Sequence, residues 1–508
     1  MIKKCIYMSA TRCGALVAAA ALAASPALLA REAVVQPASE GAQPVQAAEP
    51  VDPELIAVLQ MQAGRKVSEY EQSRGRLVSV RVSVSIDTDS ARLTADFGPG
   101  FRPGIEQEYA EAFLHSLATT LRYYAGLAGV RIHDVDYLFE GKPLKHYFPA
   151  DLTVPALARV DPANATALVS SSHGLVRVFP SADWDFQRPL AFGVREDNIT
   201  PPYGDELQQL LEQRSGLTVT RARSRLLDLH PESGRPWEQM SSRYHLKALL
   251  PNRADIWNSL PADTARDREV REDIRARPLY ANEIGVGALI SLHTNGHDVA
   301  SVRGVEVFYH GDKPADRPLA NSVLCGMREL IRAQPGYENF PIRDAANEGR
   351  HGENRIGSMP SVLVEIAYHS NAEDAAALQD PVFRAASMKG VEKGYRLFRE
   401  GKACSPFLLN PIPDISLPAG TSQEITLPFE GHPQFPVTME FTTANCSRPG
   451  ACTPSKTTFA DPAVPVTVRM RCAGNLTGEA RWSVVLRDAD GVATAPVEFQ
   501  HTCFKPAA

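Results

Sequence analysis

The stretch that decides the fold is Ala288-Leu-Ile-Ser-Leu-His293-Thr-Asn295, an apolar run that ends in polar side chains. Two further runs have the same form: Ala167-Leu-Val-Ser-Ser-Ser-His173-Gly174 and Val362-Leu-Val-Glu365-Ile-Ala-Tyr-His-Ser-Asn371. Short continuous apolar runs are typical of strands buried on both faces, and here they alternate with segments of helical spacing. We therefore predict an α/β domain over 160–405, with a mainly parallel sheet, flanking helices and a closing helix at 382–399.

Two histidines and a glutamate interrupt or end these predicted strands. In open α/β sheets ligands bind outside the carboxyl ends of the strands, so His173, His293 and Glu365 can meet although they are far apart in sequence. A hydrolytic Zn²⁺ takes three N or O ligands and keeps one position for water. A carboxylate that does not bind the metal can then transfer the proton. These residue types indicate a metal-assisted hydrolytic site.

Several segments resemble one family, the zinc-dependent N-acetylmuramoyl-L-alanine amidases of the amidase_3 type. The stretch 290–295 resembles the family's Ser-x-His-x-Asn element, and 304–310 resembles the strand that follows it. Arg355 and the stretch 359–371 resemble the segment that holds the family's catalytic Glu. The resemblance covers about 165–395. Arg277 with Tyr280-Ala-Asn282 resembles the family's approach to the second His strand, and the segment from Glu196-Asp-Asn198 to Val219-Thr-Arg221 resembles its helix that begins with a ligand Glu.

The resemblance implies roles for single residues. Zinc would bind His173, Glu196 and His293, Glu365 would be the general acid/base, and Asn295 and Arg355 would have supporting roles. It also implies cleavage of the amide between N-acetylmuramic acid and the L-alanine of the peptidoglycan stem peptide. Two alternatives remain open: a non-catalytic wall-binding or regulatory protein on a degenerate amidase fold, and a zinc peptidase that acts on the stem peptide.

Two features depart from the family pattern. The first His lies in Ser171-Ser172-His173-Gly174, without the family's usual glycines, and an insert at 222–271 separates Glu196 from the second His strand. In some family members an inserted helix plugs the zinc site, and we hypothesise the same for 222–271. The remaining histidines of the region are expected on the surface, namely His230, His245, His297, His310, His351 and His369.

The N-terminal part is predicted to be exported and then to fold separately. Residues 1–30 combine early positive charges with a short apolar, alanine-rich run, as secretory signal peptides do. Residues 31–52 read as a linker. Alternation over 77–86, a helical pattern over 105–124 and a strand at 130–137 predict a small α+β domain at 53–150, which faintly resembles GerMN-like domains.

The C-terminal part, 410–508, has short alternating strands and frequent turns, which predict a small antiparallel β-sandwich. Six cysteines follow the signal, and an even count in an exported chain favours disulfides. Fifteen pairings are open. The simplest is local: Cys325 with Cys404, Cys446 with Cys452, and Cys472 with Cys503. Both flanking domains would be targeting or partner-binding modules.

Composition limits the partners. The 508 residues carry 53 Lys+Arg against 59 Asp+Glu, a net charge of −6, so no basic excess points to nucleic acid. Once the signal is cleaved we expect no stable membrane anchor, and a periplasmic or secreted location. The expected partners are peptidoglycan and, from the resemblance, an activator or division protein.

Overall fold

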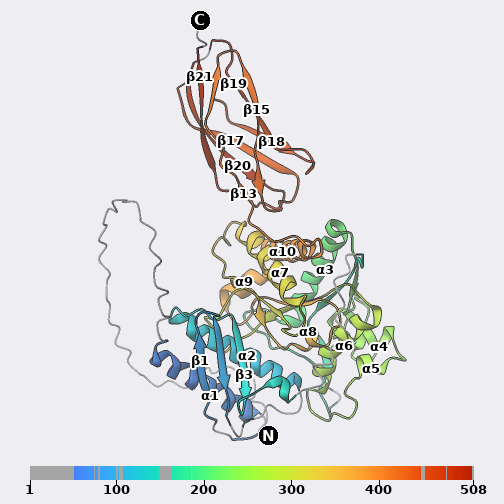
Figure 1. Cartoon of the computed structure of the whole chain (residues 1–508). Helices are drawn as coiled ribbons and strands as arrows, with labels where there is room; N and C mark the ends of the chain where they lie inside the picture. Colours follow the sequence, from blue (N-terminus) through green and yellow to red (C-terminus); the bar gives the residue numbers. More distant parts are fainter. Residues whose placement is uncertain are drawn as a thin grey trace.

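The computed structural model describes residues 51–505, except 74, 78–79, 99–100, 102–106, 148–162, 182, 448–451 and 476. The expected signal peptide and nearly all of the expected linker lie outside the described residues. The N-terminal part lies against one side of the central domain, and the C-terminal strands form an elongated unit that projects from the opposite end (Figure 1). None of the described helices is long and apolar enough to cross a lipid bilayer.

The centre of the molecule is a sheet of six strands in the order β11-β10-β12-β9-β5-β8. Pairing is parallel everywhere except between β10 and β12, so β10 and β11 run against the other four strands and the sheet is mixed. The strand bounds are β5 Thr166–Ser171, β8 Thr218–Arg221, β9 Leu289–Asn295, β10 Glu306–Tyr309, β11 Asn347–Glu348 and β12 Ser361–Tyr368.

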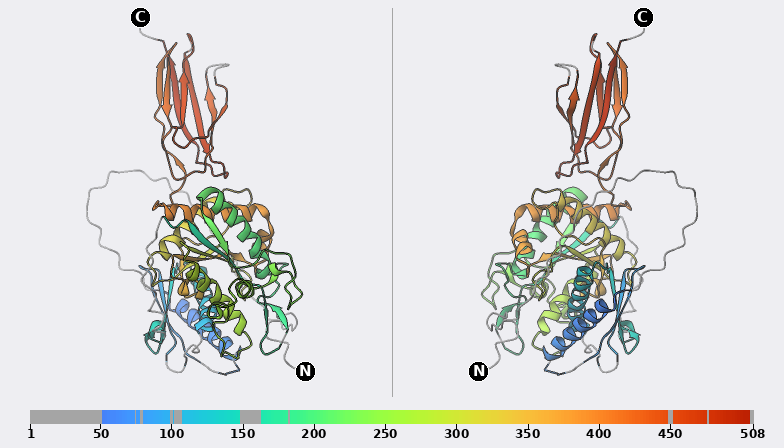
Figure 2. Two further views of the ribbon diagram at one scale, coloured as in Figure 1. Left: turned by 90° about the vertical axis from the view of Figure 1, so that its right-hand side faces the viewer. Right: turned by 90° about the vertical axis from the view of Figure 1, so that its left-hand side faces the viewer.

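Helices cover both faces of this sheet (Figure 2). One face packs against α3 (Glu196–Ser215), α7 (Asp316–Arg332) and α10 (Pro381–Arg399), with α9 (Ala372–Gln379) beside β12. Alternate strand residues, such as Leu168 and Leu289, point to the other face and pack with α4 to α6. The remaining elements here are α4 Ser242–Leu249, α5 Ala254–Trp257, α6 Arg268–Ile284, α8 Gly352–Ile356, β6 Leu175–Arg177, β7 Trp184–Phe186 and a 3₁₀ turn at Trp237–Gln239.

The insert at 222–271 is therefore part of the domain's core. It forms α4 and α5, and its residues Ala222, Leu246 and Ile256 are buried in one cluster with Leu168 and Leu289 of the sheet. Burying this apolar surface stabilises the second face of the sheet. Deleting residues 226–264 would expose that face and destabilise the domain. Such a deletion would therefore not show whether the insert plugs the site.

The N-terminal part contains one four-stranded sheet, β1-β2-β3-β4, and two long helices. Its elements are α1 Pro53–Ser73, β1 Ser83–Asp87, β2 Arg92–Asp96, α2 Gln107–Leu127, β3 Asp134–Phe139, β4 Lys142–Pro143 and a 3₁₀ turn at Leu144–His146. Sequence analysis did not predict α1, although Leu55, Leu59, Ala63 and Val67 recur every four residues and are buried. The strand expected from residue 77 begins only at Ser83.

The C-terminal part consists of β-strands packed around a common apolar core. The five-stranded sheet β14-β21-β20-β17-β18 lies with two short pairs, β13-β16 and β15-β19. β14 and β21 pair in parallel, whereas we expected an antiparallel arrangement throughout. The bounds are β13 Leu408–Leu409, β14 Ile415–Pro418, β15 Ser422–Thr426, β16 Phe429–Glu430, β17 Val437–Cys446, β18 Ser455–Phe459, β19 Thr467–Arg471, β20 Gly478–Arg487 and β21 Val497–Phe504.

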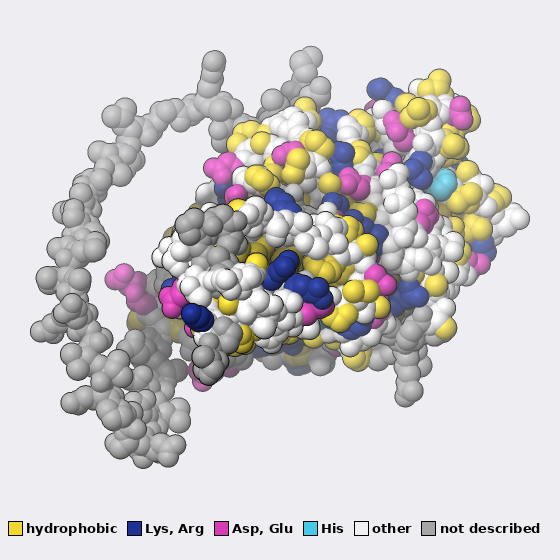
Figure 3. Space-filling model, turned by 90° about the horizontal axis from the view of Figure 1, so that it is seen from above, with side chains coloured by type: hydrophobic (Ala, Val, Ile, Leu, Met, Phe, Trp, Pro, Cys, Tyr) yellow, Lys and Arg dark blue, Asp and Glu magenta, His cyan; other side chains and the backbone are white. Residues whose placement is uncertain are grey.

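Hydrogen bonds and ion pairs join this part to the central domain, whereas each disulfide lies within one of the two parts. The three expected disulfides are all present, and Cys325–Cys404 ties α7 to the chain that leaves α10. Asp490 accepts hydrogen bonds from Arg214 of α3 and forms an ion pair with Lys389 of α10 at 3.0 Å. On the face seen in Figure 3, basic and acidic side chains are interspersed with apolar and uncharged ones.

Candidate active site

Three potential metal ligands meet at the carboxyl ends of β5 and β9. His173 follows β5, Glu196 is the first residue of α3, and His293 lies near the end of β9. One ligand atom from each lies within 4.8 Å of the other two. Glu196 Oε1 is 3.3 Å from His173 Nε2 and 3.0 Å from His293 Nδ1, so these two nitrogens face the carboxylate. The exposed fractions are 1, 2 and 7% for His173, Glu196 and His293.

The backbone around these ligands is fixed by local hydrogen bonds. Glu196 Oε1 accepts from the Ser172 hydroxyl at 2.9 Å and from the Thr294 N–H at 3.1 Å. The Gly174 N–H donates to Asp197 at 2.7 Å. Gly174 has φ +113°, and a Cβ there would lie 2.7 Å from the Ser241 nitrogen, so only glycine fits after His173. A carboxylate in the first turn of a helix is also favoured by the helix dipole.

Burial and neighbouring charges shift the ligands' pKa values in different directions. Burial, with help from Arg188, lowers the pKa of His173 to about 3, which keeps its imidazole neutral. Burial alone would raise the pKa of Glu196, but the two imidazoles beside it lower the pKa well below its ordinary value. Burial opposes protonation of His293, yet Glu353 and Glu196 raise its pKa to about 10. In the metal-free protein His293 therefore carries the positive charge.

Glu365 lies beside the ligands without joining them. Parallel pairing of β12 with β9 places Glu365 opposite His293. Burial is the main cause that raises the pKa of Glu365 to about 8, and the nearby carboxylates of Glu196 and Glu306 add to it. The side chain is 7% exposed, and its Oε2 makes no hydrogen bond to any described residue. A buried carboxyl with a free oxygen beside a ligand set suits a group that exchanges protons.

The ligand set fits Zn²⁺. Two imidazoles and one carboxylate are the protein ligands of known hydrolytic zinc sites, which leave a fourth position open. His173 Nε2 is buried and has no hydrogen-bond partner among the described residues. A buried polar atom of this kind is unfavourable unless something binds it. The donor types, the spacing and this nitrogen, which faces Glu196 Oε1 at 3.3 Å without a hydrogen bond, all agree with a cation between the three side chains.

One carboxylate that the sequence did not reveal, Glu353, contacts a ligand. Glu353 of α8 accepts a hydrogen bond from His293 Nε2 at 2.8 Å, on the side of the ring away from Glu196. Glu353 lies two residues before Arg355, outside the segments that resemble the family, so the sequence gave no signal of this contact. Helix α8 thus makes this contact to His293. The insert at 222–271, which we expected to be a plug, contacts the backbone next to His173, because Arg223 donates to the Ser172 carbonyl.

The expectation that the other histidines are on the surface is wrong for several of them. His310, His369 and His230 are buried, and His369 Nδ1 lies 3.0 Å from the Thr294 hydroxyl beside the ligands. We expected these histidines at the surface because a single His shows no periodicity from which its burial could be predicted. Contacts between distant segments bury them, as where His230 packs against the rings of Trp184 and Tyr244.

The two predicted supporting residues contact the N-terminal part instead of the three ligands. His115 Nε2 of α2 lies 3.1 Å from Asn295 Oδ1. Glu111 of α2 accepts from Arg355 Nε at 3.0 Å and from the Gly352 N–H at 2.9 Å. Helix α2 therefore holds both the residue after β9 and the start of α8. Lys66 and Arg65 of α1 add ion pairs to Asp298.

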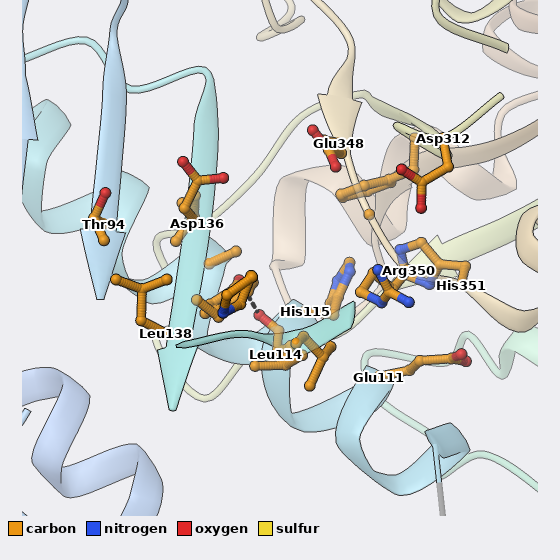
Figure 4. Close-up of a pocket in the computed structure, with 17 residues that line it drawn as sticks. Thr94, Glu111, Leu114, His115, Asp136, Leu138, Asp312, Glu348, Arg350 and His351 are labelled. Atoms are coloured by element: carbon orange, nitrogen blue, oxygen red, sulfur yellow. Dashed lines mark hydrogen bonds between the residues drawn. The ribbon is translucent and has the colours of Figure 1, made fainter. Parts of the chain in front are cut away.

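A cavity of about 430 Å³ lies between these two parts (Figure 4). It is lined by α2 and β3 on one side, and by Phe308, Arg350 and His351 on the other. His115 and His351 both line it and contact each other edge to face, with ring centres 5.2 Å apart. None of the three candidate ligands lines this cavity, so it is separate from the site.

Comparison with known proteins identifies the central domain. Residues 187–395 match the family Amidase_3, described as N-acetylmuramoyl-L-alanine amidase, and so the resemblance predicted from the sequence is confirmed for this part of the chain. The match contains Glu196, His293 and Glu365, whereas His173 lies before it. No curated protein matches the chain significantly.

Solved structures of such amidases are also similar to the central domain. The catalytic domain of CwlV from Bacillus (Paenibacillus) polymyxa var. colistinus is 17% identical, covers 45% of this chain and 94% of its own, and gives a TM-score of 0.30. CwlD from Clostridioides difficile, solved in complex with the GerS lipoprotein, is 16% identical, covers 47% and 100%, and gives 0.33. AmiC2 of Nostoc punctiforme is 17% identical, covers 46% and 95%, and gives 0.29.

Proposed function

We propose that this protein is an exported, zinc-dependent amidase that cleaves the bond between N-acetylmuramic acid and the L-alanine of the peptidoglycan stem peptide. The observation that carries the proposal is the buried group of His173, Glu196 and His293 with Glu365 aligned beside it. The family match of the surrounding segment supports this substrate over other amides.

Each residue has a defined task in this proposal. His173, Glu196 and His293 hold Zn²⁺, which supplies a Lewis acid that polarises the scissile carbonyl. Glu365 takes a proton from the attacking water and returns it to the nitrogen of the leaving L-alanine. The raised pKa of Glu365 places it near neutral pH, where a carboxyl group can serve in both directions. Burial of the whole group keeps bulk water from the transferred proton.

Product identity tests the proposal. The native protein and Glu365→Gln are incubated with purified sacculi, and the released material is analysed by mass spectrometry. We expect stem peptides that begin with a free L-alanine amino group from the native protein, and about 10²- to 10⁴-fold less from the variant. Peptides cut between amino acids would instead identify a zinc peptidase. No release by either protein would favour a wall-binding or regulatory role.

Three disulfides among the described residues support the exported location, since such bonds persist in oxidising compartments. We propose a periplasmic or secreted protein whose signal peptide is residues 1–30. The 53–150 and 410–508 domains would then serve targeting or partner binding. A fusion of 1–30 to a reporter, followed for export and cleavage, checks the first part of this proposal.

A further inference from the structure

The two candidate histidine ligands are connected behind the site by a continuous set of polar side chains. His173 Nδ1 lies 3.2 Å from Gln187 Oε1, and Gln187 Nε2 donates to Asp273 Oδ2 at 3.0 Å. Asp273 and Glu353 both bind the guanidinium of Arg277. Glu353 Oε2 then accepts from His293 Nε2 at 2.8 Å. The path runs from one imidazole to the other through four side chains.

Each contact uses the ring nitrogen that faces away from Glu196. His173 Nε2 and His293 Nδ1 face that carboxylate, whereas His173 Nδ1 and His293 Nε2 carry the contacts to Gln187 and Glu353. An acceptor on the outer nitrogen keeps the proton there and leaves the inner nitrogen's lone pair for a metal. The same acceptor also fixes the rotation of the ring.

Three of the four members, Asp273, Arg277 and Glu353, are buried with their charges paired, and Gln187 is half-buried. Arg277 and Asp273 are 0% exposed, one turn apart on α6, and Arg277 is flanked by two carboxylates. Removing one member of such a buried group leaves the charges of the others unpaired, which is unfavourable. The insert adds a further contact, since the Arg243 N–H at the start of α4 donates to Asp273 Oδ1 at 3.1 Å. The network thus links α8, α6 and the insert to both ligands.

We propose that Gln187, Asp273, Arg277 and Glu353 form one positioning network that orients both histidines for metal binding. The inference rests on the proposed function, because it assumes that these histidines hold the metal. Asp273 and Arg277 touch neither the ligands nor the reacting atoms and act through Gln187 and Glu353. Loss of either end should therefore weaken metal binding even though every ligand remains.

Metal affinity measures this role directly. The full-length protein is stripped of metal, and its affinity for Zn²⁺ is determined by competition with a chromophoric chelator. We expect about 10- to 100-fold weaker binding for Glu353→Gln, Gln187→Leu and Asp273→Asn. The combined Gln187→Leu and Glu353→Gln variant should lose less than the product of the two single losses, because both act through one network.

A matched control separates positioning from general damage. Glu392 is also 0% exposed and pairs with an arginine one turn away, Arg396 at 2.9 Å, on the opposite face of the sheet. Glu392→Gln should leave Zn²⁺ affinity unchanged. As a second readout, the visible absorption bands of the Co²⁺-loaded protein should shift in the network variants and stay fixed in the control.

The outcomes distinguish the positioning network from the proposed amidase function. Network variants that bind Zn²⁺ like the native protein and give its Co²⁺ spectrum would overturn the network while leaving the amidase proposal in place. A native protein that binds no Zn²⁺ would overturn the proposed function itself. If Asp273→Asn does not fold, the Zn²⁺ affinity of Gln187→Leu, which changes a side chain at the end of the path, decides whether the network exists.

Discussion

Replacing Glu365 by glutamine should make the metal-free protein more stable, and increasingly so as the pH rises. In the unfolded chain Glu365 titrates near its ordinary value of 4.5, whereas burial raises its pKa to about 8 in the folded protein. Folding therefore favours the protonated form. The penalty is absent below the unfolded pKa, grows as the pH rises from about 4.5 to about 8, and is constant above that. Glutamine is neutral throughout and removes the penalty.

The size of the effect follows from the shift. Each pKa unit corresponds to about 1.4 kcal/mol, so a rise from 4.5 to about 8 gives a penalty of up to about 5 kcal/mol at alkaline pH. This is comparable to the whole stability of many domains, which is about 5–15 kcal/mol. The metal must be removed first, because a nearby cation would favour the charged carboxylate and shrink the difference.

Urea unfolding of the chelator-treated proteins at pH 5 and pH 8.5 gives the comparison. Three of the four tryptophans, Trp184, Trp237 and Trp257, lie in the central domain, so fluorescence follows the relevant transition. The free energy of unfolding of Glu365→Gln minus that of the native protein should increase between the two pH values by several kcal/mol. An equal difference at both pH values would refute the assignment of Glu365 as a buried, protonated carboxyl.

A second measurement on Glu365→Gln and two further changes give three more tests. Glu365→Gln should retain bound zinc while hydrolysis of sacculi falls about 10²- to 10⁴-fold, and a parallel loss of zinc would point to a ligand role instead. Glu111→Gln removes an acceptor for the start of α8, so amide exchange over 349–356 should become faster; unchanged protection would show that α2 does not hold this segment. Replacing Cys325 and Cys404 by alanine removes a disulfide that closes a loop of 79 residues. Because the unfolded chain then gains conformational entropy, the free energy of unfolding should fall by about 4.5 kcal/mol. An unchanged denaturation midpoint would contradict this reasoning.

Much of the central fold was predictable because its strands are buried on both faces. The runs at 167–173, 288–295 and 362–371 became β5, β9 and β12, since continuous apolar stretches leave few other arrangements. The closing helix at 382–399 agrees with α10 to within a residue. The reversed direction of β10 was not predictable, because strand direction depends on contacts across the sheet rather than on local composition.

The meeting of His173, Glu196 and His293 was predictable, but their surroundings were not. The carboxyl ends of the buried strands β5 and β9 hold His173 and His293, and the start of α3 holds Glu196. Such positions can be located from the sequence pattern. Gln187, Asp273 and Glu353 come from a loop and two helices whose sequences show ordinary polar residues. Their role depends on side-chain contacts between segments far apart in the sequence: Gln187 and Asp273 are 86 residues apart, and His293 and Glu353 are 60 residues apart. No local periodicity records such contacts.

The central claim is that one zinc ion binds between His173, Glu196 and His293, and metal analysis of the purified full-length protein tests it most directly. His173 is the decisive position, because it lies outside the family match, and its place beside the other two ligands rests on the strand pattern and the structure. We predict about one equivalent of zinc in the native protein and a large loss in His173→Ala with the fold retained. Full zinc occupancy in His173→Ala, or none in the native protein, would contradict the account.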